Sequence, residues 1–440
     1  MRATPLIAFA SRYIHTLSVG RLRSRSALER WQERKIARHI AAVRALSPFY
    51  RELWEGWSDT EWRQFPIIEK TEMMAHFDRL NTVGVRKEEA MEIALRAERT
   101  RDFRSAIGSV TIGLSSGTSG NRGLFLVSER ERLAWAGSVV AKLLPGALLR
   151  GERIAFFLRA DSKLYQSVRQ GRLQFAFFDL LTPYGSHIER LNALRPTVLV
   201  GPPSLLRMLA ASRRAGDLPI RPRKIISVAE VLDPLDRAFI EAAFGQRLHQ
   251  VYQCTEGFLA STCAYGTIHV NEDIVHMDKE YVDKAHGKFV PIVTDFSRLA
   301  QPIIRYRLND VLTEKKGRCP CGSPFMAIES IDGRCDDLFC VPAAGDSGRT
   351  IPLFPDFISR AIIASSDRIE EYEAVQLSPE RMRVALRIDP ASRPQAEEAV
   401  RAALDGLCRQ AGCRPMAIEF APYAQGPGDR KLRRVRRSWT

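Results

Sequence analysis

A run of small and hydroxyl-bearing residues is the first feature of this 440-residue sequence that indicates chemistry. It follows a short β-branched segment and consists of Ser115, Ser116, Gly117, Thr118, Ser119 and Gly120. Glycine lacks a Cβ, so the N–H groups and hydroxyls of such a loop can approach phosphate oxygens closely. The run lacks the Lys-Ser or Lys-Thr ending of a Walker loop and the spacing of a dinucleotide fingerprint. It predicts a phosphate-handling loop, and an ordinary polar turn is the alternative.

A second set of residues has the composition of a metal site. Cys263 and His269 lie close together in the sequence, and Cys319 and Cys321 form another short cluster. Three thiolates and one imidazole suit tetrahedral zinc, and four protein ligands leave no open position for catalysis. The sequence therefore predicts a structural zinc site. The alternative is that each cysteine is simply buried, as free cysteines often are.

The loop, in the form SSGTSGNRG, resembles the loop with which the adenylate-forming superfamily grips the phosphates of ATP. The chain is similar over nearly its whole length to the phenylacetate–coenzyme A ligase branch of that superfamily. A tyrosine and a Thr-Glu pair of the branch are matched by Tyr252, Thr255 and Glu256. The resemblance implies that Tyr252 lies beside the adenine, that Thr255 approaches the α-phosphate and that Glu256 reaches Mg²⁺. A carboxylate is the ligand such a hard cation prefers.

Two further segments extend the resemblance to the nucleotide site. Ala229 and Glu230 stand where similar enzymes have a Gly-Ala-Glu turn near the nucleotide, with Val228 in place of the glycine. Asp310 ends a segment that resembles the Arg-Tyr-Arg-Thr-Gly-Asp motif of the family. The resemblance implies that Asp310 accepts hydrogen bonds from both ribose hydroxyls.

The last two motif matches are a hinge segment and a lysine near the C-terminus. The segment 333–337 resembles the hinge about which the small domain of the family rotates between half-reactions, and Arg334 is implied to contact the nucleotide. Lys431 matches the lysine that contacts the carboxylate of the acid and the phosphate, although Arg430 replaces the usual preceding glycine. A cation there would stabilise the transition-state charge on the α-phosphate. The alternative for Lys431 is a solvated basic tail.

These residues together predict an AMP-forming ligase that converts a carboxylic acid and MgATP into an acyl-adenylate and pyrophosphate, and then transfers the acyl group. An acid that is aromatic or apolar is expected, from the cluster Phe156, Phe157, Tyr165, Phe175, Phe177 and Phe178. Coenzyme A is the first choice of acceptor. Relatives that conjugate an amino acid, that use a carrier protein or another amine, or that transfer AMP to a cofactor are alternatives. A catalytically silent nucleotide-binding regulator is an alternative of another class.

The elements that must position these residues follow from hydrophobic periodicity. Short apolar runs at 154–158, 197–200, 224–228 and 249–253 alternate with helical stretches at 203–215 and 234–244, which indicates a parallel sheet. Strand patterns at 373–377, 381–388 and 416–420 flank a helical stretch at 394–410. We therefore expect an α/β fold. It comprises a large N-terminal adenylation domain with mixed and parallel sheets, residues 1–332, and a small mobile C-terminal α+β lid, residues 333–440.

Composition narrows the class of protein further. The formal charge of +15 suits a polyanionic ligand such as ATP or coenzyme A, and basic residues are scattered instead of forming one stripe, so nucleic acid is not expected. Charged residues interrupt every apolar run before it could span a bilayer, so no membrane partner is expected. Eight cysteines are too few for a disulfide scaffold and predict a reducing, cytoplasmic location. The basic N-terminus is interpreted as a structural lead-in, with a targeting segment as the alternative.

Overall fold

The computed structural model describes residues 3–20, 22, 24–103, 105–115, 122–144, 146–169, 171–345, 348–424 and 433–439. Within them, the largest sheet has 12 strands, and five neighbouring strands in the order β5-β4-β6-β7-β8 are parallel. These strands are β4 Glu152–Leu158, β5 Leu173–Asp179, β6 Val198–Gly201, β7 Lys224–Ser227 and β8 Leu248–Cys254. Their Val, Ile, Leu and Phe side chains suit strands that are covered on both faces.

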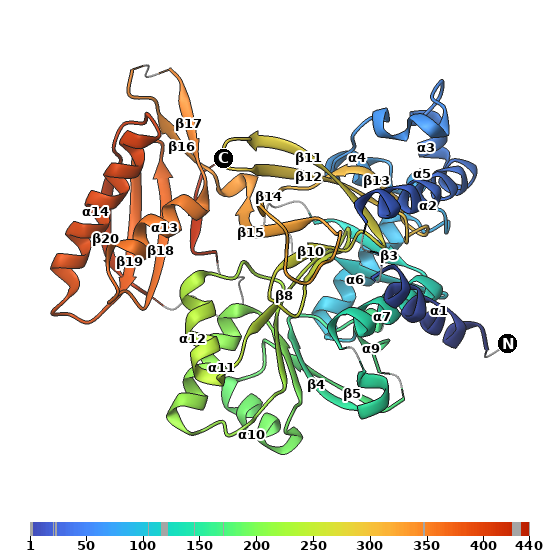
Figure 1. Cartoon of the computed structure of the whole chain (residues 1–440), viewed down its shortest axis with the longest axis horizontal. Coiled ribbons are helices and arrows are strands. Elements are labelled where there is room, and N and C mark those ends of the chain that lie inside the picture. The colour runs from blue at the N-terminus through green and yellow to red at the C-terminus, as the bar shows by residue number, and fades with distance from the viewer. Residues whose placement is uncertain are drawn as a thin grey trace.

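Helices that cross from one parallel strand to the next cover one face of this sheet (Figure 1). They are α10 Tyr184–Leu194, α11 Pro203–Ala215 and α12 Pro234–Phe244. The short helix α9 Lys163–Gln166 lies on the opposite face, where the ring of Tyr165 contacts Phe156. Proline occupies the first turn of α11 and α12, and a left-handed glycine ends each, Gly216 at φ 94° and Gly245 at φ 67°. Proline costs no hydrogen bond at a helix start, and glycine adopts positive φ without strain. The two helices therefore have the bounds expected from the sequence.

The second part of the large sheet is mostly antiparallel. Its strands are β9 Gly257–Thr262, β10 Ile268–Val270, β11 Val275–Asp283, β12 Lys288–Asp295, β13 Ile303–Arg307, β14 Asp310–Glu314 and β15 Ala327–Arg334. β9 turns back antiparallel to β8, with Cys254 paired to Gly257. This tight reversal leaves Thr255 and Glu256 at the tip of a turn, where their side chains are available for a site.

The N-terminal part is helical and leads into a small sheet. Its helices are α1 Ala3–Val19, α2 Arg25–Leu46, α3 Pro48–Leu53, η1 Asp59–Gln64, α4 Lys70–Ala75, α5 Phe77–Leu80 and α6 Lys87–Thr100. The strands β1 Ala106–Ile107, β2 Val110–Leu114 and β3 Leu124–Val127 follow, then α7 Glu129–Leu143 and α8 Ala147–Arg150. Ser128 and Glu131 form a capping box that starts α7 directly after β3. His76 separates the short helices α4 and α5.

The C-terminal part has its own sheet and its own core (orange and red in Figure 1). Its elements are η2 Cys335–Asp337, β16 Phe339–Pro342, β17 Thr350–Leu353, α13 Pro355–Ser365, β18 Glu371–Ser378, β19 Arg381–Arg387, α14 Arg393–Gln410, β20 Ala417–Pro422 and β21 Val435–Arg437. Four of the strands form a sheet in the order β20-β19-β18-β21. The fold prediction, a large sheet-and-helix domain followed by a small α+β domain, is confirmed.

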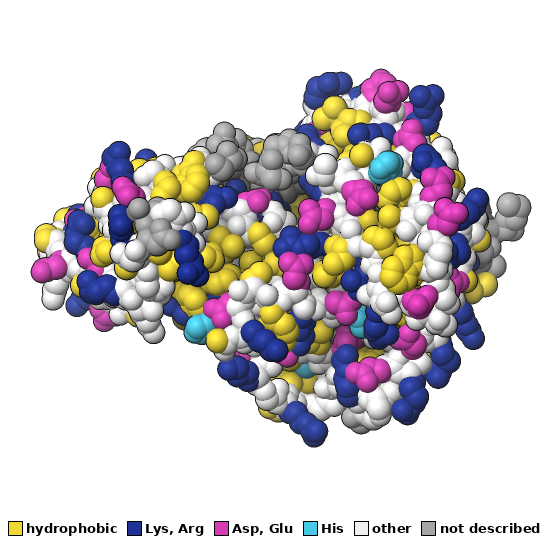
Figure 2. Space-filling view, turned by 90° about the horizontal axis from the view of Figure 1, so that it is seen from above, with side chains coloured by type: hydrophobic (Ala, Val, Ile, Leu, Met, Phe, Trp, Pro, Cys, Tyr) yellow, Lys and Arg dark blue, Asp and Glu magenta, His cyan; other side chains and the backbone are white. Residues whose placement is uncertain are grey.

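The surface carries charges of both signs. On the face in Figure 2, Lys and Arg side chains are intermixed with Asp and Glu, and no continuous basic stripe crosses it. Among the helices of the described residues, none has the length and apolarity to cross a lipid bilayer.

Candidate active site

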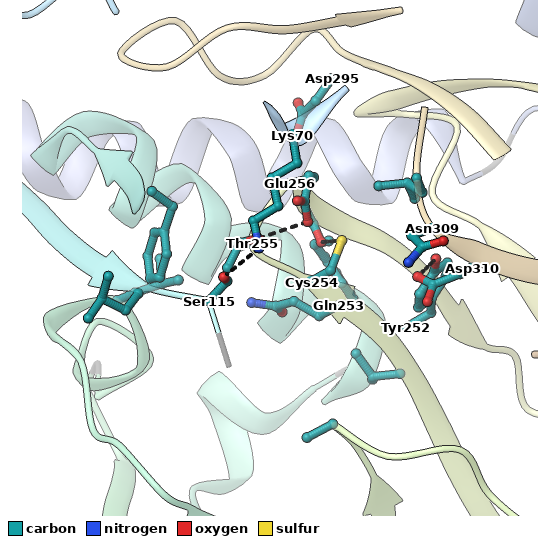
Figure 3. Close-up of a pocket in the computed structure, with 18 of the residues that line it drawn as sticks. Lys70, Ser115, Tyr252, Gln253, Cys254, Thr255, Glu256, Asp295, Asn309 and Asp310 are labelled. Carbon is teal, nitrogen blue, oxygen red and sulfur yellow. Dashed lines mark hydrogen bonds between the residues drawn. The ribbon is translucent and has the colours of Figure 1, made fainter. Parts of the chain in front are cut away.

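A cavity of about 760 Å³ lies at the carboxyl ends of the parallel strands β7 and β8, and residues of α4, α7, β2 and β14 are also part of its lining. Ligands of open α/β sheets bind at this edge, because the loops that leave the strands converge there. Figure 3 shows the cavity with Lys70, Ser115, Thr255 and Glu256 close together and with Tyr252 and Asp310 further along the same wall. Residues that are far apart in the sequence thus share one site.

One end of the cavity is formed by Tyr252 and Asp310. Tyr252 is 7% exposed on β8, and its hydroxyl donates a hydrogen bond to Oδ2 of Asp310 at 2.5 Å. Burial and the neighbouring Asp310 carboxylate raise the pKa of Tyr252 well above its ordinary value. The tyrosine therefore stays neutral and donates its proton, which fixes the orientation of the carboxylate at the start of β14.

Thr255 and Glu256 lie in the turn between β8 and β9, and hydrogen bonds from several residues hold them there. Thr255 Oγ1 donates to Glu256 Oε2 at 2.8 Å, and the Tyr306 hydroxyl donates to Glu256 Oε1 at 3.3 Å. Arg298, 8% exposed, donates from Nη1 to the Thr255 carbonyl at 2.5 Å. Because both carboxylate oxygens already accept a hydrogen bond, the group is held in one direction before any ligand arrives.

Lys70 is a cavity residue that no sequence motif marked. It is the first residue of α4, and its Nζ donates to Ser115 Oγ at 3.2 Å. Ser115 is tied to Gly123, whose N–H donates to Ser115 Oγ at 2.7 Å, and a Cβ at Gly123 would lie 2.9 Å from Lys70 Cε. Burial lowers the pKa of Lys70, while Glu256 acts in the opposite direction. The structure therefore places a lysine between the start of the predicted phosphate loop and the turn of Glu256.

Ala229 and Glu230 also line the cavity, after β7. Ala229 has φ 70°, a left-handed conformation that is uncommon for a residue with a Cβ and that concentrates at functional sites. Glu230 Oε2 accepts a hydrogen bond from the Ser204 N–H at 3.3 Å in the first turn of α11. This turn therefore holds a left-handed backbone at Ala229, directly after Val228.

The cavity extends to the connection with the C-terminal part. Arg334 ends β15 and lines the cavity, and Asp336 accepts a hydrogen bond from Asn309 Nδ2 at 2.6 Å. Asp337 pairs with Arg433, whose Nε lies 3.1 Å from Asp337 Oδ2. Lys431 and the loop residues Ser116, Gly117, Thr118, Ser119 and Gly120 lie outside the described residues.

A narrower apolar pocket of about 110 Å³ adjoins the main cavity, and Trp135, Tyr165 and Gln253 line both. Phe156 and Phe175 line this pocket from β4 and β5. Phe157 and Phe178 of the predicted aromatic cluster instead stack on each other at 4.5 Å in the core on the other face of the sheet. Side chains alternate between faces along a strand, so one run of aromatic residues supplies both a pocket and a core.

The predicted metal-ligating residues come together away from the cavity. The ligand atoms of Cys263, His269, Cys319 and Cys321 all lie within 4.8 Å of one another. Cys263 Sγ lies 3.7 Å from Cys319 Sγ, and Cys321 Sγ lies 3.4 Å from His269 Nε2. His269 Nδ1 lies 3.0 Å from the Phe325 carbonyl, so Nδ1 carries the proton and Nε2 is left as a possible ligand.

Comparisons with known proteins found relatives both in sequence and in structure. No family model matches the sequence. The chain is 27% identical over 218 residues to an indoleacetate–lysine synthetase of Pseudomonas savastanoi, a match that covers 46% of this chain and 53% of that protein. It is 22% identical over 387 residues to a phenylacetate–coenzyme A ligase of Thermus thermophilus, with 80% of this chain and 78% of the relative covered. The first match thus spans about half of that relative.

A solved structure shows the same architecture. It is a 2-hydroxyisobutyryl-CoA ligase in the postadenylation state in complex with its acyl-AMP, 2-HIB-AMP, and it superposes with a TM-score of 0.70 at 19% identity. The superposition covers 92% of this chain and 88% of the ligase. The expected fold is thereby confirmed: this chain has the fold of that acid–CoA ligase. The two relatives matched by sequence are also ligases of acids, an indoleacetate–lysine synthetase and a phenylacetate–coenzyme A ligase.

Proposed function

We propose that this protein activates a carboxylic acid with ATP, forms an acyl-adenylate and pyrophosphate, and then transfers the acyl group to an acceptor. One observation carries the proposal above all. A single cavity brings the start of the loop at Ser115, the turn of Thr255 and Glu256, and the pair Tyr252 and Asp310 together in the order an ATP molecule needs. The matched relatives, which are ligases of acids, support it.

In the first step a carboxylate oxygen of the acid attacks the α-phosphorus, and the bond to the bridging oxygen of pyrophosphate breaks. The attacking carboxylate is already ionised at neutral pH, so no protein base is needed. We assign Asp310 to the ribose hydroxyls, Tyr252, Ala229, Glu230 and Arg334 to the nucleotide, and Thr255 to the α-phosphate. Catalysis then consists of positioning and of charge stabilisation by Lys70, by Lys431 and by the loop 115–120.

Glu256 fits a magnesium site. Magnesium is usually held by one or two carboxylates together with substrate phosphates, and Glu256 lies on the cavity wall beside the loop that would hold those phosphates. When bound, the ion would neutralise charge on the phosphate oxygens. The protein holds the carboxylate in place through Thr255 and Tyr306.

The acid is proposed to be aromatic or apolar. Its side chain would occupy the 110 Å³ pocket, which is lined by Phe156, Phe175 and other apolar side chains. Burying such a group in a preformed apolar pocket is favourable because the apolar area leaves water. Coenzyme A is the proposed acceptor. The second candidate is an amino acid, because the 27% identical relative is an indoleacetate–lysine synthetase.

We also propose that Cys263, His269, Cys319 and Cys321 hold a structural zinc ion. Zinc–sulfur bonds of about 2.3 Å in a tetrahedron give sulfur–sulfur distances of about 3.8 Å, and Cys263 and Cys319 are 3.7 Å apart. None of the eight cysteines, all of which the structure describes, forms a disulfide, which supports the expected reducing, cytoplasmic location.

Acid-dependent release of pyrophosphate tests the proposed function. Purified protein is incubated with MgATP and a panel of aryl, arylacetic and aliphatic acids. It is then given coenzyme A or lysine, and thioesters and amides are separated by mass. Glu256→Gln and Lys431→Ala should each lower release about 100-fold or more. Glu189→Gln is the control, because Glu189 is exposed on α10. Release that does not depend on any acid would contradict the proposal.

A further inference from the structure

The N-terminal helix α1 forms part of the wall of the cavity. It packs along α7 so closely that a Cβ at Gly137 would lie 2.5 Å from the Phe9 carbonyl oxygen and 3.1 Å from the Tyr13 nitrogen. Thr16 Oγ1 lies 3.4 Å from Ser138 Oγ across the same contact. Such an approach needs glycine at position 137, and it fixes α1 against the helix that carries Trp135 and Ser138 into the cavity. Figure 1 shows the two helices side by side.

Arg12 is the residue with which α1 reaches the cavity. Burial lowers the pKa of Arg12, whereas the carboxylates of Asp273 and Asp295 act in the opposite direction. Within the part of the chain that the structure describes, no residue accepts a hydrogen bond from its guanidinium. A guanidinium has five N–H donors, and a desolvated donor without an acceptor is unfavourable.

The carboxylates around Arg12 already have other partners. Asp273 lies 2.7 Å from Lys142 Nζ. Asp295 Oδ1 accepts hydrogen bonds from the Ser297 N–H at 2.8 Å and from the Ser297 hydroxyl at 2.6 Å. Asp273 and Asp295 both offset the charge of Arg12, whereas Arg130 opposes them. The two carboxylates would repel a second negative charge on a ligand. A neutral oxygen would satisfy the donors of Arg12 at a smaller desolvation cost.

Arg12 also lies on the side of the cavity where the acid is proposed to bind. Trp135 and Ser138 are about one turn apart on α7 and both line the main cavity, and Trp135 also borders the apolar pocket. The nucleotide residues Tyr252 and Asp310 line the main cavity but do not border the apolar pocket. An apolar group in the pocket can therefore carry a substituent toward the Ser138 side of α7.

We propose that Arg12 is a specificity-determining residue that donates hydrogen bonds to a neutral oxygen substituent, such as a hydroxyl or a carbonyl, on an otherwise apolar acid. This inference rests on the proposed function, because it assigns a group of the acid substrate. It also gives the N-terminal helix a role in the site. The proposed substrates are therefore aromatic acids that carry a hydroxyl or carbonyl group away from the carboxylate.

The test compares phenylacetate with 2-, 3- and 4-hydroxyphenylacetate, with kcat/KM for pyrophosphate release as the readout. Wild-type protein should prefer at least one hydroxylated acid over phenylacetate. Arg12→Met should lower that preference about tenfold or more, as expected for the loss of a hydrogen bond to a charged group. The same variant should leave kcat/KM for phenylacetate and KM for ATP within about twofold. Arg12→Lys, which keeps the charge but loses the fork geometry, should fall between the two.

Arg34→Met is the matched control, because Arg34 is exposed on the neighbouring helix α2 and loses the same charge. An equal loss for phenylacetate and its hydroxylated partner in Arg12→Met would show a purely structural role and overturn the inference. A wild-type enzyme without preference would also overturn it. If no acid supports pyrophosphate release, the proposed function fails. Calorimetry then still decides the role of Arg12, by measuring the binding of phenylacetate and of 3-hydroxyphenylacetate to the wild-type protein and to Arg12→Met. Weaker binding of the hydroxylated acid alone in Arg12→Met supports the role. Equal binding of each acid to both proteins overturns it.

Discussion

Replacing Lys70 tests the stabilisation of transition-state charge separately from any effect on folding. Its Nζ lies 3.2 Å from Ser115 Oγ, and it lies close enough to Glu256 for the carboxylate to influence its pKa. In the proposed reaction it faces the phosphates, where a preorganised cation lowers the barrier. We expect Lys70→Met to lower kcat for pyrophosphate release about 100-fold and to leave thermal stability unchanged. Lys87→Met, at a partly exposed lysine that starts α6 outside the cavity, is the control, and an equal effect in both variants would contradict this role.

The pH dependence of the same residue gives a second prediction. Burial lowers the pKa of Lys70 from its ordinary range near 10, and the proposed role requires the protonated form. Activity should therefore fall as pH rises through this lowered pKa. Lys70→Arg should move the alkaline limb of the kcat profile to higher pH, because arginine stays charged over the whole range. A limb that does not move in Lys70→Arg would mean that another group titrates there.

At the scale of elements, the Cys₃His cluster joins the strands β9 and β10 to the connection between β14 and β15. Cys263 follows β9, His269 lies on β10, and Cys319 and Cys321 lie in the long connection between β14 and β15. Metal binding by preformed ligands contributes to folding stability. We expect purified protein to contain about one equivalent of zinc, and Cys321→Ser or chelation to reduce it below about half an equivalent and to lower Tm.

Metal analysis and thermal unfolding check this prediction together. Cys340→Ser is the control, because Cys340 lies on β16, outside the cluster, and its variant should keep its zinc. Zinc below half an equivalent in wild-type protein prepared without chelators would contradict the site. Unchanged metal content in Cys321→Ser would do so as well.

At the scale of the whole molecule, buried polar contacts join the two parts of the chain. Arg434, 8% exposed, contacts Asp236 of α12 with Nη2 at 2.7 Å from Oδ1, and the Tyr372 hydroxyl donates to Asp233 Oδ2 at 2.6 Å. Burial raises the pKa of Asp236, whereas Arg434 lowers it. Removing one partner of a buried ion pair costs about 3–5 kcal/mol because the other charge stays desolvated. These contacts therefore favour the orientation of the C-terminal part seen here.

If that orientation serves adenylation, Asp236→Asn should weaken the first half-reaction more than the second. We expect acid-dependent ATP–pyrophosphate exchange to fall about tenfold or more, while acyl transfer from added acyl-adenylate keeps its rate. The control is Glu419→Gln, because Glu419 pairs with Arg381 in an exposed contact within the C-terminal sheet. Equal losses in both half-reactions would indicate general destabilisation instead.

The sequence by itself determined most of the elements and the order of the site residues. Helices at 203–215 and 234–244 follow from periodicity with proline at the start and glycine at the end, which are local signals. The motif residues Tyr252, Thr255, Glu256 and Asp310 were likewise read from short segments. Their roles remain predictions, as do the domain bounds at 332 and 333.

The tertiary structure alone decided which isolated residues join those motifs. Lys70 and Arg12 stand in segments without a motif, and they line the cavity because α4 and α1 pack against elements far away in the chain. Phe156 faces the pocket, and Phe157, the next residue on the same strand, faces the core. Only the tertiary structure shows which face of that strand a ligand can reach. Local patterns carry information on period and on turns. The shape and charge of a cavity arise from long-range packing, which local patterns do not encode.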